Sequence, residues 1–284
     1  MDTSATDALR EARAQPVARR IARAGYAANG IVHALMGAVV IAVAVGGGGD
    51  SGHSGAFRAI GQVPLGFVLL WVLTGCLLAL GLWHGTSAVL ARGPRRRTTW
   101  GMRLSEAGQA VAFLAVGGLA AAIALGARPQ GERTAQDASR GILSLPGGPW
   151  LLGAIGLGVG IAGIAFVAIG VRRGFRKVMT IPDGAIGRTI TALGIVGYTA
   201  KGVALGVVGT LLVVAAVKLD PGEAGGLDGA VHALRAMPAG PYLVGLVGAG
   251  LVAYGVFCGA RTRYARMERG TAAPPSRRSA AVTA

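Results

Sequence analysis

The sequence has few charged residues, few aromatic residues and almost no cysteine. Only 14% of its 284 residues are charged and 5% are aromatic, whereas 52% are hydrophobic and the mean hydropathy is +0.57. Water-soluble domains carry about 25% charged residues, so a soluble globule is excluded. Two cysteines are too few for a disulfide scaffold, and 49 glycines without a period of three exclude collagen. The composition is that of a polytopic membrane protein.

Long stretches without Asp, Glu, Lys or Arg define the expected spans. A helix that crosses a bilayer core needs about 20 apolar residues. Five stretches are free of charge over at least 21 residues, and a sixth is interrupted only by Lys201. They are 24–49, 59–91, 107–127, 141–171, 236–260 and the interrupted stretch 189–217. Because none alternates apolar and polar residues as a barrel strand does, we expect an all-α, polytopic membrane helix bundle of six transmembrane helices.

The net charge of +16 is unevenly distributed between alternate connections. One set of segments holds 21 of the 28 Lys and Arg residues, while the other holds six bases and six acids. The sets are 1–23, 92–106, 172–188 and 261–284 for the first, and 50–58, 128–140 and 218–235 for the second. Basic connections stay on the cytoplasmic side. The pattern therefore predicts an inner (cell) membrane protein with both termini cytoplasmic, and anionic headgroups as contacts of the basic segments.

Nucleic acid is the other partner that such a basic chain suggests. No recognition helix and no basic segment interleaved with aromatic residues accompanies the charge. We therefore expect the lipid bilayer as partner and no nucleic acid, and we leave possible membrane protein partners open.

An internal repeat organises the chain. Shifts of 82 and then 92 residues align prolines and glycines at the start and middle of every second helix. The aligned positions are Pro64, Gly66 and Gly81, then Pro146, Gly148 and Gly163, then Pro238, Gly240 and Gly255. We expect three two-helix units in a pseudo-threefold bundle, each with a short amphipathic helix in its loop. The segments are a cytoplasmic N-terminal part (1–24), three repeats (25–91, 100–171 and 189–261) and a basic cytoplasmic tail (262–284).

These repeats resemble a known family. The sequence GYAANGIV at 25–32 and the sequence GYTAKGVA at 197–204 are similar to the opening of the bacterial integral membrane family called domain of unknown function 1206, which has three tandem two-helix copies. The Pro-x-Gly start of each second helix adds to the likeness. The middle copy, SEAGQAVA at 105–112, departs from it because Glu106 replaces the tyrosine. The resemblance implies fold and membrane location, and the family has no established activity.

Glycines at small-xxx-small spacing indicate close helix contacts, which drive association in membranes. The pairs are Gly81 and Gly85, Gly156 and Gly160, Gly202 and Gly206, and Gly255 and Gly259. In a chain this rich in Gly and Ala, chance accounts for some such pairs. Gly81, Gly163 and Gly255 are better candidates because they also keep the repeat register.

A polar layer is the one candidate site within the spans. Its members take equivalent helix positions in the three repeats, namely Tyr26, Asn29 and His33, then Glu106 and Gln109, then Tyr198 and Lys201. A cation in mid-membrane costs about 2.5 to 3.5 kcal/mol, so Lys201 should face the interior, with Glu106 as its expected partner. The layer is either a structural register pair or a site for an anion, a proton or a headgroup.

Metal or cofactor chemistry has weak support. His33 and His84 are conceivable ligands of a metal or haem, but no carboxylate in the same run would orient them. Cys76 and Cys258 have no ligand-spaced partners and are typical of small apolar packing residues. Nucleophile-elbow, zinc-helix, P-loop and dinucleotide motifs are missing. We therefore expect no catalytic residues, no cofactor, no metal and no enzyme.

Two functions of different classes fit these observations. The first is a non-enzymatic structural or interaction protein of the membrane, which uses glycine-lined faces and its basic surface. The second is a small-solute or ion permeation unit with the layer of Glu106 and Lys201 lining its route. Transporters commonly have broken helices at mid-membrane, and no expected span has a proline near its middle, which favours the first.

Overall fold

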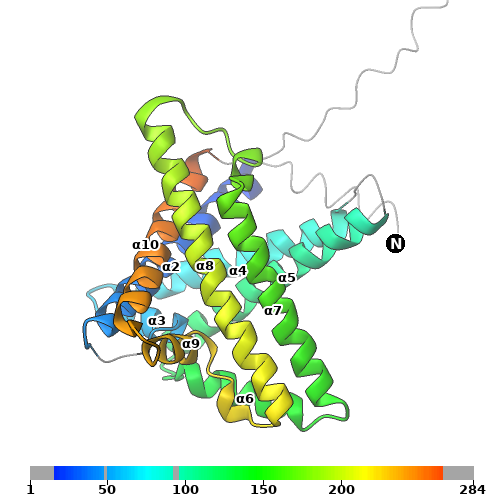
Figure 1. Ribbon diagram of the computed structural model, residues 1–284. Coiled ribbons are helices and arrows are strands. Elements are labelled where there is room, and N and C mark those ends of the chain that lie inside the picture. Colours follow the sequence, from blue (N-terminus) through cyan, green and yellow to red (C-terminus); the bar gives the residue numbers. More distant parts are fainter. Residues whose placement is uncertain (1–15, 48–49, 92–95, 265–284) are drawn as a thin grey trace, which may run out of the picture.

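Six long helices make up most of the protein, which is described by a computed structural model over residues 16–47, 50–91 and 96–264 (Figure 1). They are α2 (Pro16–Ala44), α4 (Gly66–Leu90), α5 (Arg96–Ala124), α7 (Gly148–Val171), α8 (Gly184–Lys218) and α10 (Gly240–Tyr264). Each contains a segment long and apolar enough to cross a membrane. No strand occurs within these ranges, so the all-α six-helix prediction is confirmed.

A short helix joins the two long helices of each repeat. These are α3 (His53–Gly61), α6 (Gly131–Leu143) and α9 (Gly226–Arg235). The 3-10 turn η2 (Pro221–Glu223) precedes α9, and a second turn, η1 (Gly174–Lys177), connects α7 to α8. Helix α6 contacts both α3 and α9, so the three short helices gather at one end of the bundle. We call this end the short-helix face and the opposite end, with the Arg-rich connections, the basic face.

Each short helix is joined to the following long helix by the same tight turn. The residue before the long helix has a left-handed backbone in all three repeats, with φ of 63° at Leu65, 74° at Gly147 and 60° at Ala239. The next residue is glycine each time, because an added Cβ would overlap with a carbonyl oxygen of the short helix. The Pro-x-Gly pattern in the sequence therefore corresponds to a real, repeated backbone geometry.

The most extensive helix contacts join one repeat to the next. The pairs are α4 with α5, α7 with α8, and α10 with α2. A Cβ added at a glycine of the second helix would lie close to a backbone nitrogen of the partner helix, at equivalent positions in every pair. These contacts are Gly81 to Leu114 (3.1 Å), Gly163 to Gly206 (2.8 Å) and Gly255 to Ala34 (2.7 Å). The three antiparallel pairs thus share one register, as pseudo-threefold repeats require.

The middle repeat is the least enclosed part of the bundle. Half of the apolar segment of α2 and of α10 is buried, whereas only 17% is buried in α5 and in α7. Contacts join α2 to α4 and α8 to α10 within their repeats, but α5 and α7 are not packed along each other. Figure 1 shows the α4 and α5 pair diverging from the α7 and α8 pair. Helix α5 is therefore remote from α8.

The chain ends are only partly described. Helix α2 begins at Pro16 and continues without a break into the first span, a position where proline is well tolerated because a first-turn N–H has no helical partner. Of the expected N-terminal segment, residues 1–15 lie outside the described residues, as do residues 265–284 of the expected basic tail.

Candidate functional site

Lys201 lies against aromatic rings inside the bundle. Its Nζ is 4.4 Å from the ring centroid of Tyr254 and 5.2 Å from that of Phe166. Tyr198, one turn earlier on α8, packs edge-on against Tyr254 at 5.3 Å. The ring faces attract the ammonium group, and such a contact contributes about 2 kcal/mol when desolvated. The ammonium group of Lys201 therefore lies between aromatic side chains of α7 and α10.

Helices α2 and α10 supply the polar groups beside Lys201. Asn29 Nδ2 donates to Cys258 Sγ at 3.6 Å, and Tyr254 precedes Cys258 by one turn on α10. The imidazole of His33 lies 4.9 Å from the Tyr254 ring, and its Nδ1 is 2.9 Å from the carbonyl oxygen of Asn29. Cys258 is therefore a hydrogen-bonding member of the site as well as a packing residue.

A second cation, Arg261, lies at the end of this group nearest the basic face. Its guanidinium carbon is 4.4 Å from the ring centroid of Tyr26, and its buried Nε has no hydrogen-bond partner. Within the described ranges neither Lys201 nor Arg261 forms an ion pair or a side-chain hydrogen bond. We define these residues as the interior cluster: Tyr26, Asn29, His33, Tyr198, Lys201, Tyr254, Cys258 and Arg261.

The expected pairing of Glu106 with Lys201 is corrected by the structure. Glu106 Oε2 instead lies 2.8 Å from Nδ1 of His84, which stacks on Phe113 at 5.3 Å. Gln109 also stays outside the interior cluster and donates to the carbonyl oxygen of Ser105, one turn earlier on α5. The physical reason is that α5 packs on α4 and not on α8, so the polar face of the middle repeat meets a different neighbour.

The two histidines considered as metal or haem ligands have different polar neighbours. His84 is paired with Glu106 on the α4 and α5 side, and its ring meets that of Tyr26 edge-on at 6.4 Å. His33 faces Tyr254 and also His53 of α3, whose ring centroid is 6.1 Å away. The interior cluster is thereby extended through His33 and His53 toward the short-helix face.

His53 is in an unfavourable position for protonation. Burial and then the positive charge of Lys201 lower the pKa of His53 to about 4, against an opposing effect of Asp50. The pKa of an unfolded-state histidine is about 6.5. As the pH falls from 6.5 to 4 the unfolded chain binds a proton that the folded chain does not, so folded stability is lost in that window and is fully present above it.

We therefore expect the stability of His53→Gln to fall less steeply than that of the wild type as the pH is lowered below 6.5. Between pH 6.5 and 4 this group should lower the free energy of unfolding of the wild type by up to about 1.4 kcal/mol per pH unit. The variant lacks this contribution, so its loss should be smaller by the same amount. Thermal melts in one detergent at pH 8, 6 and 4.5 measure the difference. Parallel profiles for the two proteins would show that His53 protonates as easily in the folded chain as in the unfolded one.

Three members of the interior cluster were missed by the sequence reasoning. Tyr254, Cys258 and Arg261 occupy positions i, i+4 and i+7 of the last span, which place them on one helix face. That spacing is the signal that could have revealed them. Because only the third repeat carries them, a search for residues repeated in all three units passes over them.

Three tandem hairpins with six apolar spans define this chain as a multi-pass membrane repeat protein. The sequence profile of the Domain of Unknown Function (DUF1206) matches residues 24–91, 105–173 and 196–265, and the chain belongs to this family. It is 26% identical over 249 residues to "Uncharacterized protein YxxB" of Bacillus subtilis (strain 168), a match that covers 86% of this chain and 90% of that protein. No solved structure matches significantly.

Proposed function

We propose that this protein is a non-enzymatic membrane protein that binds a small anion in the interior cluster and lets it permeate. The observation that carries this proposal is the presence of two inward-facing cations, Lys201 and Arg261, with no acidic partner in the described parts of the chain. An unpaired charge inside a membrane is expensive and marks ion or substrate pathways. A bound anion would offset that cost.

The chemistry of the surrounding groups suits an anion. Hydroxyl groups of Tyr26, Tyr198 and Tyr254 and the amide of Asn29 are hydrogen-bond donors, and such donors are used to line anion pathways. The ligand is a small inorganic anion or the anionic group of a lipid, which are both negatively charged and both accept hydrogen bonds.

The position of the cluster also fits a route across the bundle. Arg261 is in the last turn of α10, next to the basic face, and Lys201 is midway along α8. From there His33 and His53 continue toward the short-helix face. We further propose the cell membrane as location with both termini cytoplasmic, which the excess of Arg and Lys in alternate connections supports.

Flux in vesicles tests the proposal. The full chain is reconstituted in phosphatidylcholine vesicles, and chloride and phosphate efflux are compared for wild type, Lys201→Met and Lys218→Gln. Methionine keeps the linear shape of lysine and removes its charge, whereas Lys218 is an exposed cation on the same helix that pairs with Glu223. We expect Lys201→Met to lower the flux at least tenfold and Lys218→Gln to leave it unchanged.

A second set of vesicles with added phosphatidylglycerol separates the two sources of the anion. Inhibition of flux by the anionic lipid would show that its headgroup competes for the cluster. Equal flux through wild type and Lys201→Met, in either lipid, would contradict the proposal.

A structural or interaction role is the second candidate, and one observation favours it. Helices α5 and α7 are little buried within the bundle, so their faces are available to lipid or another membrane protein. The glycine faces, in contrast, are largely used within the chain, because Gly81, Gly163 and Gly255 contact neighbouring helices. If Lys201→Met changes thermal stability and no flux is found for the wild type, this role becomes the better explanation.

A further inference from the structure

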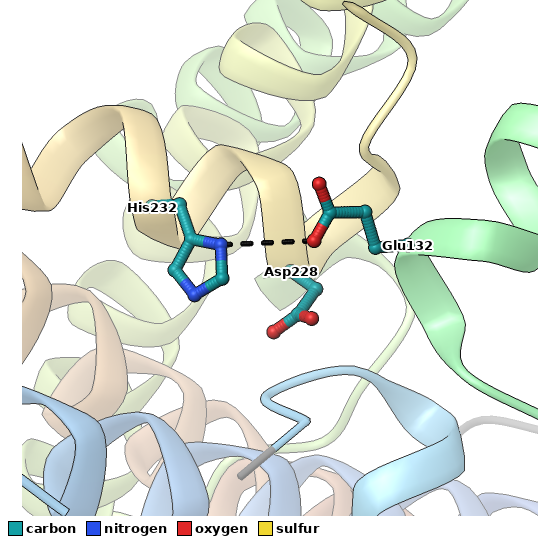
Figure 2. Close-up of side chains that lie close together, drawn as sticks. All are labelled: Glu132, Asp228 and His232. Carbon is teal, nitrogen blue, oxygen red and sulfur yellow. Dashed lines mark ion pairs between the residues drawn. The ribbon is translucent and has the colours of Figure 1, made fainter. Parts of the chain in front are cut away.

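Three potential metal ligands from two short helices converge on the short-helix face. Glu132 comes from α6, and Asp228 and His232 come from α9, where they are four residues apart and share one face. One ligand atom of each lies within 4.8 Å of the others. Figure 2 shows the three side chains directed toward a common space between the two helices.

The distances fit a shared ion better than a direct ion pair. Nδ1 of His232 is 3.7 Å from Oε2 of Glu132, which is too long for a hydrogen bond. Two ligands that each lie about 2.0 to 2.1 Å from a tetrahedral zinc ion are about 3.4 Å apart. A small inward movement of exposed side chains would close the site, and more than half of the His232 side chain is exposed.

In each of the two carboxylates, one oxygen accepts hydrogen bonds from residues that are not among the three ligands. Oδ1 of Asp228 accepts hydrogen bonds from the backbone N of Ser51 at 2.9 Å and from its Oγ at 2.6 Å. Oε1 of Glu132 accepts from Nε2 of Gln136, which also donates to the carbonyl oxygen of Gly222. Such bonds orient metal-ligating carboxylates and leave one oxygen of each directed at the ion.

The other two repeats do not reproduce the ligand set. Positions equivalent to His232 are Arg58 and Arg140, and positions equivalent to Asp228 are Ser54 and Gln136. The fold of a repeat therefore does not require Asp and His at these two positions. The combination belongs to the junction of the second and third repeats.

We propose that Glu132, Asp228 and His232 bind a divalent transition ion of the zinc type. One imidazole and two carboxylates suit Zn²⁺, and three protein ligands leave a fourth position for water. The ion would link α6 to α9, and through Ser51 to the start of α3, so that all three repeats are tied together at the short-helix face. The site is separate from the interior cluster, and its test does not depend on anion flux.

Zinc binding by the full chain tests the proposal. Protein without a histidine tag is treated with EDTA, exchanged into detergent buffer at pH 7 and titrated with ZnCl₂ in a calorimeter. We expect one equivalent to bind and its affinity to fall at least tenfold in both Glu132→Gln and His232→Gln. The matched control is Asp137→Asn, which removes an exposed carboxylate of α6 outside the group and should bind as the wild type does.

Thermal melting distinguishes a loss of zinc binding from misfolding of a variant. Zinc should raise the melting temperature of the wild type and of Asp137→Asn, but not that of either ligand variant. Melting of the ligand variants without zinc is compared with that of the wild type to establish that they fold. Absence of zinc binding by the wild type would overturn the proposal, and so would undiminished binding by folded His232→Gln. Binding of Ca²⁺ as tight as that of Zn²⁺ would contradict the zinc-type assignment.

Discussion

Gly202→Ala should cause one of the two largest losses of stability in this protein. A Cβ at this position of α8 would lie 2.6 Å from the carbonyl oxygen of Gly163 and 2.8 Å from the backbone N of Val167 on α7. Backbone atoms of a helix cannot move aside separately, so the two helices must separate. Overpacking costs about 1 to 3 kcal/mol, and we expect the upper end because close helix contact is the main association force in a membrane.

Thermal unfolding in a single detergent measures this effect, with Gly206→Ala as the matched control. Gly206 is one turn further along α8, and a Cβ there meets no atom within 4 Å. Its replacement should be neutral or raise stability by up to about 1 kcal/mol, because alanine favours helix over glycine. If both variants lose the same stability, the α7 and α8 pair is not packed as closely as the structure indicates.

Gly148→Ala should cause a loss of similar size for a different reason. Gly148 begins α7 directly after the left-handed Gly147, and an added Cβ would overlap with the carbonyl oxygen of Ile142 in α6. The tight turn would have to open, which would displace α6 from the start of α7. A clash with fixed backbone belongs to the mechanisms behind large mutational effects, and we expect about 3 kcal/mol.

The matched control for this turn is Gly153→Ala, within the same helix. A Cβ at Gly153 would make an ordinary contact of 3.7 Å with the side chain of Ala216. Melting temperature and yield of protein from membranes should both fall for Gly148→Ala and stay near wild type for Gly153→Ala. The equivalent turns at Gly66 and Gly240 predict the same loss, so a tolerated alanine at all three positions would contradict the turn geometry.

The sequence predicts several residues of the candidate site, but it does not predict which helices contribute to that site. Helix periodicity predicts a shared face for Tyr26, Asn29 and His33, and all three are buried in the structure. The cost of a buried charge predicts that Lys201 faces the bundle interior. Glu106 was assigned to the same site because it occupies an equivalent repeat position. Equivalence along the chain says nothing about how far apart two helices pack, and α5 lies against α4.

The zinc-type site is a second case in which the sequence alone does not reveal which residues are neighbours. Its ligands lie on two short helices about a hundred residues apart, and neither helix carries a metal-binding motif alone. Only the gathering of α6 and α9 at one face makes Glu132 a neighbour of His232. A search for ligand spacing along the chain detects the Asp228 and His232 pair at most.

By itself, the sequence determined that the chain is a membrane protein of six helices in three repeats, because apolar run length, alternating charge and recurring Pro-x-Gly turns are local properties of the chain. Tertiary structure alone decided which polar faces meet, since helices in lipid associate through packing at small residues and not through hydrophobicity. That packing joined α10 to both α8 and α2, left α5 against α4, and so placed two cations together without the carboxylate that sequence equivalence predicts for them.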